Sequence, residues 1–407
     1  MKTFNVPVIY RSPLISAIKN QRKQEDRMKK DFTPTELNFG PLRILLARHF
    51  GFCYGVENAI EIAFKTVDEN PGKRIFLLSE MIHNPHVNND LLDRGVQFIM
   101  DTSGNQLVAW ETLVPDDIVI IPAFGTTLET ERQLASLGIE PLKYNTTCPF
   151  VERVWNKAEQ IGKKNYTVIV HGKPKHEETR ATFSHSQAGT PTVVVKDIKE
   201  AALLAAFING QKHPDEFYDL FKGQYSPGFN AATDLQRVGV VNQTTMLATE
   251  TQAIADYIRQ VMIATFQLTE ATVGERFADT RDTLCYATND NQTAVTGMLL
   301  EPADLAIVVG GYNSSNTSHL VELCEEKLPT YFISSPEHML SENAINHWDF
   351  HHKKEISSDS FLPQKEQVTI LLTSGASCPD ALVEGVIRRL LSFYQLEHKA
   401  DELAIAE

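Results

Sequence analysis

The chain has 407 residues, of which 42% are hydrophobic and 22% charged, and its formal net charge is −14. A chain of this length is too long for a single hydrophobic core, so we expect two or three domains. The acidic balance argues against a nucleic-acid-binding protein, which would carry a basic surface. No window has the roughly eighteen uninterrupted apolar residues that a membrane span needs.

Residues 1–40 are predicted to form a polar N-terminal extension. Basic residues occur in it, but it lacks the compact apolar region and small-residue cleavage site of a secretory signal. Glu25, Asp26 and Asp31 count against an organellar transit peptide. We therefore expect a cytoplasmic protein with neither a membrane nor a nucleic acid as partner.

After residue 40, short apolar or β-branched runs alternate with stretches of helical periodicity. The runs predict strands at 43–47, 74–78, 117–121, 166–170, 192–195, 238–241, 305–309, 330–333 and 368–372. The periodic stretches predict helices at 56–67, 128–137, 151–161, 198–208, 248–266, 317–326 and 379–393. This alternation is typical of βαβ units and indicates an α/β fold with mostly parallel sheets.

The predicted elements group into three α/β domains, at residues 41–147, 148–278 and 279–394. Residues 213–234 have mixed polarity and turn residues, and we expect a surface insertion there in the second domain. Residues 336–365 look like an irregular polar connection. Residues 395–407 are expected to form a C-terminal tail outside the core.

Five cysteines are present, with long spacings and no CxxC motif, which is typical of reduced thiols and not of a disulfide framework. Cys53, Cys148 and Cys285 each fall where a predicted strand or loop gives way to a helix, one in each predicted domain. Such junctions are where parallel sheets present functional groups. Cys324 lies within a predicted helix beside apolar positions and is expected to be a buried structural residue. Cys378 also lies between a strand and a helix.

Three converging thiolates suit an iron–sulfur cluster in which one iron has no protein ligand. Cubane clusters usually take four thiolates, and a catalytic metal site keeps a position open for substrate. Zinc is the rival metal, but zinc ligands usually come in closely spaced pairs. On pattern alone, Cys378 remains open as a fourth ligand.

Polar side chains suited to an anion recur in the loops after predicted strands. They are His83, His86, His171, Lys173, Lys175, His176, Glu177, Glu178, Gln243, Thr244, Thr245, Asn313, Ser314, Ser315, Asn316, Ser374 and Ser377. Each alone could be a helix cap or an ordinary surface residue. Together they supply neutral donors and histidines at helix starts, which suit a phosphate or diphosphate. The chain has no P-loop, GxGxxG or HExxH motif, so nucleotide binding and zinc proteolysis lack support.

Eight of these segments, taken in order, resemble one family. They are "GFCYGV", "IHNPHV", "NTTCP", "HGKPKHEET", "NQTTML", "CYAT", "VVGGYNSSNTSHL" and "SGASCPD", within residues 42–391. The family is that of 4-hydroxy-3-methylbut-2-enyl diphosphate reductase, the last enzyme of the methylerythritol phosphate route to isoprenoids. The segments "PAFG" and "NSSNTSHL" resemble those of the longer form of this reductase that occurs in cyanobacteria and plastids. The resemblance implies an oxygen-sensitive [4Fe–4S] cluster, one per chain, in the middle of three α/β domains arranged as a trefoil.

The resemblance also implies roles for individual residues. Cys53, Cys148 and Cys285 match the cluster ligands, and the position of Cys378 is not a ligand in the family. Substrate-binding positions are matched by His83, His176, Ser314, Ser315, Asn316 and Ser377. Thr244 matches the threonine near the substrate hydroxyl, and Glu178 matches the glutamate that delivers protons.

One position departs from the family pattern. The compact members have a diphosphate-binding histidine where this chain has Phe124, and a phenyl ring cannot donate a hydrogen bond to a phosphate oxygen. We expect His171, Lys173 or Thr126 to substitute, or the Phe124 ring to close the pocket against water.

The implied reaction is a two-electron reductive dehydroxylation of an allylic diphosphate. Hydroxide is a poor leaving group, so a proton must reach it, and Glu178 is the expected general acid. The products would be isopentenyl and dimethylallyl diphosphate. By family analogy the electron donor is a ferredoxin or flavodoxin, and the chain would be a monomer or homodimer.

Three other interpretations remain at this point. A cluster-dependent hydro-lyase would also bind a substrate hydroxyl at an open iron, but it needs no net electrons. An iron–sulfur sensor would need a basic stripe or a helix-turn-helix, and the sequence shows neither. A zinc-stabilised structural protein would contain zinc without inorganic sulfide.

Overall fold

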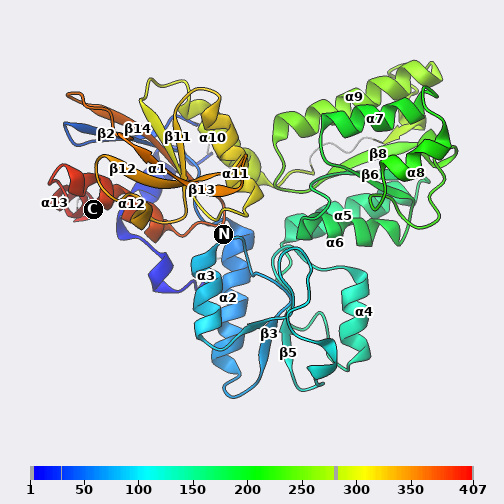
Figure 1. The fold of residues 1–407 in the computed structure, drawn as a ribbon, viewed down its shortest axis with the longest axis horizontal. Helices are drawn as coiled ribbons and strands as arrows, with labels where there is room; N and C mark the ends of the chain where they lie inside the picture. The colour runs from blue at the N-terminus through cyan, green and yellow to red at the C-terminus, as the bar shows by residue number, and fades with distance from the viewer. Residues whose placement is uncertain (1–3, 29, 279–282, 406–407) are drawn as a thin grey trace. The chain divides into compact units, whose positions relative to one another are not determined.

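A computed structural model describes residues 4–28, 30–278 and 283–405 (Figure 1). The chain divides into two compact units. Unit 1 consists of Met1–Glu61, Ile82–Asn89 and Tyr286–Glu407, and unit 2 of Ile62–Met81 and Asp90–Cys285. Two helices, α2 (Tyr54–Glu69) and α3 (Pro85–Asp93), each contain residues of both units.

Unit 1 is built on a five-stranded sheet in the order β1-β2-β14-β10-β11. The strands are β1 (Thr35–Asn38), β2 (Leu42–Leu46), β10 (Leu305–Val309), β11 (Thr330–Ile333) and β14 (Val368–Ser374). All neighbours pair in parallel except β1 and β2, which are antiparallel. The central strands β14 and β10 are buried along their whole length, as expected for parallel strands covered on both faces.

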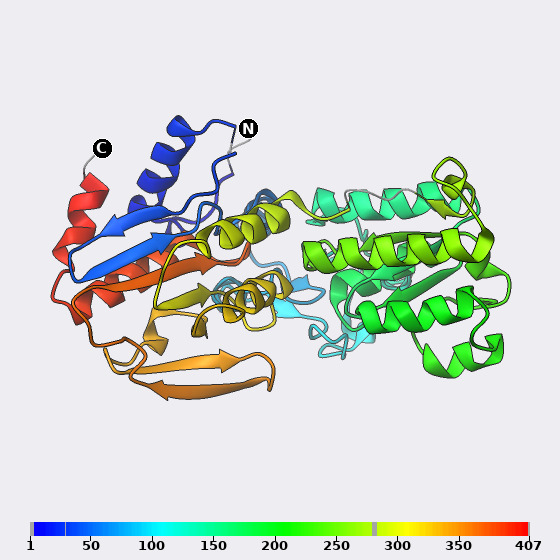
Figure 2. The same ribbon diagram turned by 90° about the horizontal axis from the view of Figure 1, so that it is seen from above.

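The helices of unit 1 pack around this sheet. They are α1 (Pro13–Glu25), α10 (Tyr286–Met298), α11 (Ser315–Glu325), α12 (Asp380–Phe393) and α13 (His398–Ile405). A separate antiparallel hairpin, β12 (Ala344–Asp349) and β13 (Lys354–Asp359), is drawn as the pair of orange arrows in Figure 2. Lys353 adopts the left-handed conformation at the hairpin turn, with φ of 52°.

Unit 2 contains two fully parallel sheets. The first has the order β4-β3-β5, from β3 (Ile75–Leu77), β4 (Gln97–Phe98) and β5 (Ile118–Ile120). The second has the order β7-β6-β8-β9, from β6 (Thr167–His171), β7 (Thr192–Val195), β8 (Val238–Asn242) and β9 (Phe277–Ala278). The helices are α4 (Leu128–Ser136), α5 (Pro149–Gly162), α6 (Glu177–Gln187), α7 (Ile198–Ile208), α8 (Phe217–Leu220) and α9 (Ala248–Phe266).

Side-chain caps explain where several helices begin. The Ser12 hydroxyl accepts a hydrogen bond from the backbone N–H of Ile15, and Pro13 opens α1. Thr127 caps α4 and Asp197 caps α7 in the same way. Because each cap satisfies a backbone donor that the helix leaves free, the chain enters these helices at a defined residue.

The sequence-based prediction of an α/β fold with mostly parallel sheets is confirmed, and every predicted strand and helix is present within a few residues of its expected bounds. The elements that were not predicted are β1, β4, β9, α1, α3, α6, α8, α13 and the hairpin β12–β13. The helix α10 corresponds to the helical stretch expected after Cys285. The three predicted domain spans stay a prediction, and β2, within residues 41–147, pairs with β14, within residues 279–394.

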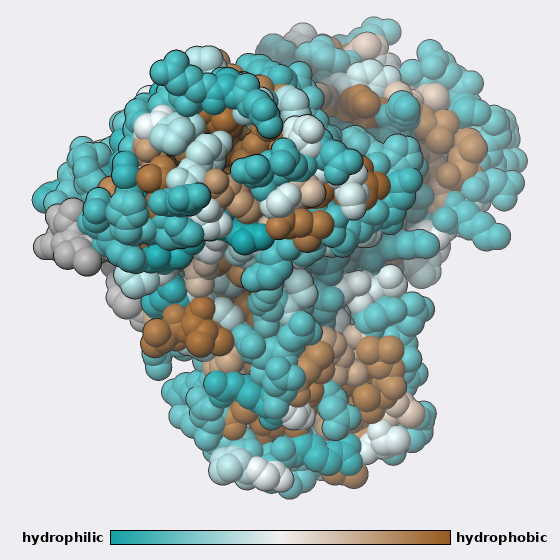
Figure 3. Space-filling view, turned by 60° about the vertical axis from the view of Figure 1, so that its left-hand side comes forward, coloured by the Kyte–Doolittle hydropathy of each residue, from teal (hydrophilic) through white to brown (hydrophobic). Residues whose placement is uncertain are grey.

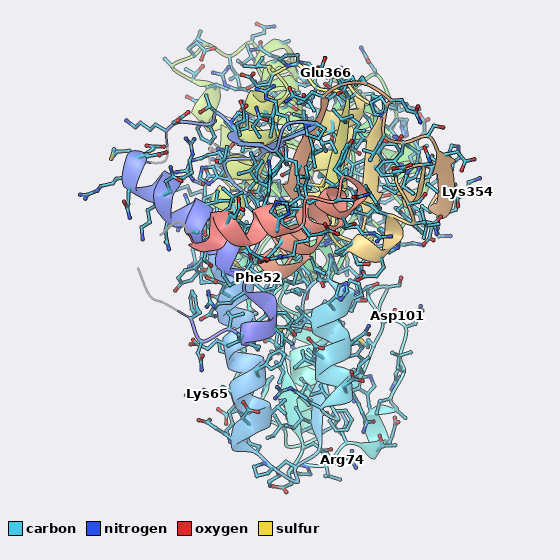
Figure 4. The ribbon with its side chains drawn as sticks, turned by 90° about the vertical axis from the view of Figure 1, so that its left-hand side faces the viewer. Phe52, Lys65, Arg74, Asp101, Lys354 and Glu366 are labelled. Carbon is cyan, nitrogen blue, oxygen red and sulfur yellow. The ribbon has the colours of Figure 1, made fainter. Side chains whose placement is uncertain are left out.

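Residues 4–38 are part of unit 1, whereas the sequence predicted a polar extension there. Leu14 and Ile15 on α1 are fully buried in its core, and β1 pairs with β2. Figure 4 shows Phe52 beside the N-terminal segment, where its ring contacts Tyr10 at 5.9 Å between centroids. The few apolar residues share one helical face, which an average over the polar segment conceals.

Two other segments pack more closely than their polarity suggested. In the expected surface insertion, Phe217 and Phe229 are buried and stack with ring centroids 4.9 Å apart. In the expected tail, Ala400 on α13 is fully buried and Asp401 forms an ion pair with Arg388 at 2.8 Å. In both cases a few buried residues anchor a largely polar segment.

No helix in the part of the chain that the structure describes is long and apolar enough to cross a membrane. The surface in Figure 3 shows brown, hydrophobic residues interspersed with teal, hydrophilic ones.

Candidate functional site

The carboxyl group of Glu178 is buried in unit 2 and accepts two hydrogen bonds from Thr244. Its exposed fraction is 1%. The backbone N–H of Thr244 donates to Oε1, and the Thr244 hydroxyl donates to Oε2 at 2.9 Å. Thr244 follows β8 and Glu178 lies in the first turn of α6, so the ends of two neighbouring strand–helix units meet here. The pair can present a proton at one fixed place.

His176 begins the same helix. Its Nδ1 accepts a hydrogen bond from the backbone N–H of Glu178 at 3.2 Å and thereby caps α6. An accepting Nδ1 leaves Nε2 as the nitrogen that carries the proton in a neutral ring. The cap therefore uses Nδ1 of His176 and not the donor atom Nε2.

The ends of β6 and β8 are joined by Gln243. Its side-chain oxygen accepts from the Thr179 hydroxyl at 3.0 Å and from the backbone N–H of Lys173 at 3.2 Å. A Cβ atom at Gly172 would lie 2.5 Å from Thr179 Oγ1, so this approach needs glycine. These contacts hold the loop that carries His176 and Glu178.

Two of the predicted cluster ligands lie close to this acid. Cys148 occupies the N-cap position of α5 without a side-chain capping hydrogen bond, and its backbone N–H donates to the Ala123 carbonyl at 2.9 Å. The backbone N–H of Cys285 donates to the Thr244 carbonyl at 3.3 Å. Burial, with smaller contributions from the charges of Cys285 and Glu178, raises the pKa of the Cys148 thiol to about 12. A thiolate at Cys148 would therefore need a positive partner, which a metal centre supplies.

Phe124 contacts His176 directly. Their ring centroids are 5.7 Å apart at an interplanar angle of 84°, an edge-to-face arrangement. Phe124 lies within the loop between β5 and α4 and has no hydrogen-bond donor on its side chain. Its ring instead limits the positions open to the His176 ring.

The loop that carries Phe124 packs against Trp155 and His185. Gly125 has φ of 75°, and a Cβ there would lie 2.5 Å from the Trp155 ring. Trp155 stacks on His185 with centroids 3.7 Å apart, and His185 Nε2 lies 3.2 Å from the Thr126 carbonyl oxygen. Burial lowers the pKa of His185. These contacts were not predicted from the sequence, because only the fold brings the four residues together.

The sequence nominated His171 and Lys173 as substitute donors. His171 is fully buried, and its Nδ1 lies 3.0 Å from the Thr251 hydroxyl at the start of α9. Lys173 is exposed. His171 is thus engaged with a different helix from the one that carries Glu178.

In unit 1, the turn before α11 presents polar groups at a helix start. Ser314 caps the helix and accepts from the backbone N–H of Thr317 at 3.2 Å. Ser315 Oγ and Asn316 Nδ2 are buried and have no hydrogen-bond partner among the described residues. Buried polar atoms usually have a partner, and a helix N-terminus favours an anion. This turn therefore has the chemistry of an anion-binding site.

The neighbouring residues converge on the same turn. Asn316 Oδ1 accepts from the backbone N–H of Ala376 at 2.9 Å, and the Ser377 hydroxyl donates to the His83 carbonyl at 3.2 Å. The backbone N–H of Cys53 donates to the Ala376 carbonyl at 3.2 Å. Unit 1 thus gathers the predicted substrate-binding residues of "IHNPHV", "NSSN" and "SGAS" beside Cys53.

Glycine is required where this turn meets its neighbours. A Cβ at Gly310 would lie 2.6 Å from Thr317 Oγ1, and one at Gly375 would be closer still. A Cβ at Gly311 would clash with the His83 carbonyl oxygen. The absence of side chains at these positions lets three loops approach each other.

The other two cysteines lie in the core of unit 1. Cys324 is fully buried in α11, which confirms the expected structural position. Cys378 is also fully buried in this core. Burial raises the pKa of each thiol to about 12. No group of three histidine, cysteine, aspartate or glutamate side chains that could hold a single metal ion occurs among the described residues.

Parallel α/β sheets that present a buried carboxyl group, thiols and an anion-binding helix start define an α/β enzyme that acts on an anionic substrate. The family described as LytB protein matches residues 44–391. The chain belongs to this family.

Its relatives include several cyanobacterial enzymes. The chain is 42% identical over 357 residues to the 4-hydroxy-3-methylbut-2-enyl diphosphate reductase of Synechococcus sp. (strain WH7803), covering 88% of this chain and 86% of that protein. It is 40% identical over 353 residues to the enzyme of the same name from Crocosphaera subtropica, covering 86% and 85%. The family resemblance drawn from the motifs is thereby confirmed.

Two solved structures share the fold. One is that of (E)-4-hydroxy-3-methyl-but-2-enyl diphosphate reductase, described as the terminal enzyme of the non-mevalonate pathway, with a TM-score of 0.51 and 26% identity over 86% of this chain and 99% of that one. The other is the E-1-hydroxy-2-methyl-but-2-enyl-4-diphosphate reductase of Plasmodium falciparum, with a TM-score of 0.61 and 21% identity over 86% and 88%. The likeness of the second concerns the fold alone.

Proposed function

We propose that this chain is an oxidoreductase with the activity of its relatives. It reduces (E)-4-hydroxy-3-methylbut-2-enyl diphosphate to isopentenyl and dimethylallyl diphosphate, the terminal step of the methylerythritol phosphate route to isoprenoids. Family membership supports the reaction. The observation that carries the mechanism is the buried carboxyl group of Glu178, held by both donors of Thr244.

The proposed cofactor is one [4Fe–4S] cluster per chain, with Cys53, Cys148 and Cys285 as ligands and one iron left without a protein ligand. The raised pKa of Cys148 fits this group, because iron would compensate the buried thiolate charge. When bound, the cluster supplies the electrons and a Lewis-acidic iron for the substrate hydroxyl. Three mainly parallel sheets accompany the three thiols, in keeping with three α/β domains in a trefoil, whose boundaries stay a prediction.

The protein's own residues bind the diphosphate and deliver the proton. In this proposal Glu178 protonates the departing hydroxyl group, and Thr244 keeps the carboxyl oriented. The diphosphate is bound by His83, His176, Ser314, Ser315, Asn316 and Ser377. Ser315 Oγ and Asn316 Nδ2, which have no hydrogen-bond partner among the described residues, support this assignment.

Further parts of the proposal rest on family analogy. The electron donor is a ferredoxin or flavodoxin, the chain acts as a monomer or homodimer, and it works in the cytoplasm.

The test is anaerobic purification, analysis of iron and inorganic sulfide, and an assay on the allylic diphosphate. Activity should require a reductant, and turnover without one would indicate a hydro-lyase instead. Single Cys→Ser variants at the three ligand positions should lose the brown chromophore or most of the activity. Cys378→Ala and Cys324→Ala are the matched controls, since both thiols are buried, and they should keep both properties. A colourless Cys378→Ala protein that still folds would overturn the ligand set.

A further inference from the structure

Tyr312 is held on three sides within unit 1. Its ring stacks on Trp348, with centroids 4.8 Å apart and planes 9° from parallel. Phe332 meets it edge-on at 5.2 Å, and its hydroxyl lies 3.0 Å from His338 Nε2.

The groups that hold Tyr312 come largely from the hairpin β12–β13 and the turn before it. Trp348 lies on β12 opposite Glu355 of β13. His338 Nε2 lies 3.8 Å from the Glu355 carboxylate, and His338 Nδ1 lies 3.2 Å from the Ser335 hydroxyl. Lys354, labelled in Figure 4, marks where β13 begins. The hairpin therefore contacts Tyr312 through its ring and, through His338, its hydroxyl.

Tyr312 also belongs to the turn that presents the predicted diphosphate ligands. The backbone N–H of Ser314 donates to the Gly311 carbonyl at 3.0 Å, which closes the turn around Tyr312. Gly311 on its other side lies against the His83 carbonyl oxygen. The turn is thus fixed by a backbone contact on one side and by the Tyr312 ring on the other.

We propose that Tyr312 is a positioning residue and that the hairpin β12–β13, through Trp348, holds the turn in its substrate-binding geometry. This inference rests on the proposed function, because it assigns the diphosphate to Ser314, Ser315 and Asn316. The ring contacts order the turn before the substrate binds. Binding therefore does not have to include the entropic cost of ordering the turn.

The test compares variants of the holoenzyme. Trp348→Ala and Tyr312→Leu should each raise KM, and the dissociation constant for inorganic diphosphate, by about tenfold. They should change kcat by less than about twofold, because neither residue contacts the reacting atoms. Trp348→Phe, which can still stack, should restore binding to within about threefold of wild type. Phe350→Ala is the matched control on the same hairpin, since Phe350 packs on His351 and not on Tyr312.

Wild-type KM and diphosphate affinity in folded Trp348→Ala and Tyr312→Leu proteins would overturn the inference. An equal loss of binding in Phe350→Ala would do the same, because it would point to general destabilisation. The calorimetric titration with inorganic diphosphate needs no turnover. A wild-type protein that binds diphosphate but does not reduce the allylic substrate would contradict the proposed function and leave this inference testable.

Discussion

Replacing Glu178 with glutamine tests the proton delivery at the centre of the proposal. Glutamine keeps the shape of the side chain but has no acidic proton to give. Its carbonyl oxygen can still accept from the backbone N–H of Thr244, and its amide can donate to the Thr244 hydroxyl. One hydrogen bond is therefore reversed and none is lost. A net bond contributes about 0.5–1.5 kcal/mol, so the folded state should survive.

The catalytic cost should be larger than the structural one. General acid catalysis contributes on the order of a hundredfold or more, which is about 2.7 kcal/mol of transition-state stabilisation. We expect Glu178→Gln to keep its iron and sulfide content and its diphosphate affinity while kcat falls by about that factor. Steady-state kinetics with a chemical reductant measure kcat, and iron and sulfide analysis measures the cluster content. The calorimetric titration with inorganic diphosphate measures the affinity.

Glu177→Gln is the matched control. Glu177 lies next to Glu178 in the same helical turn and is also buried, but its carboxylate accepts a hydrogen bond from the Ser79 hydroxyl. Its variant should keep kcat to within about threefold, well below a general-acid effect. Near-normal turnover in Glu178→Gln would refute the acid assignment, and a large loss in Glu177→Gln alone would transfer the role to Glu177.

Further outcomes follow from the same unit. Phe124→Leu should raise KM by about two- to tenfold, since the edge-to-face contact with His176 is of the kind that contributes about 0.5–1.5 kcal/mol. Phe124→His should change KM by less than about tenfold. A larger change in kcat than in KM would contradict both expectations. His171→Ala should mainly lower the melting temperature and have little effect on KM, because the ring is buried against Thr251. Burial lowers the pKa of His185, so the unfolded chain takes up a proton that the folded chain resists, and stability should fall as pH drops below about 6.5. Denaturant melts of His185→Gln between pH 7 and 5 should show a smaller loss, and an unchanged slope would argue against this account.

The parallel strands and their helices could be predicted because each leaves a local signature. Runs such as residues 305–309 and 368–372 are apolar without alternation, as buried parallel strands are, and helical periodicity separates them. The positions of the cysteines at element junctions followed from the same map. What could not be predicted is which distant strands pair, and so the membership of β2 in the sheet of β14 was missed.

Segments judged by average polarity were also missed. The burial of Phe217 and of α1 depends on a few apolar residues that share a face, and composition averages them away. The roles of Glu178 and Thr244 came from the family resemblance, whereas their two hydrogen bonds come from the fold. The Tyr312–Trp348 stack has no local signal, because the two residues are brought together only by the hairpin.

The pairing of β2 with β14 has a consequence for synthesis on the ribosome. The apolar strand β2 emerges early, but its partner Val368–Ser374 is translated roughly 300 residues later, about 15–60 s at typical elongation rates. Unit 2 is encoded almost entirely in that interval and has its own cores. Nascent β2 can pair with β1, but its other edge must wait for β14, and an apolar strand with an open edge is a site for chaperone capture or aggregation. Expression yield should therefore depend on chaperone supply. This dependence should be stronger than one would expect from the stability of the folded protein alone.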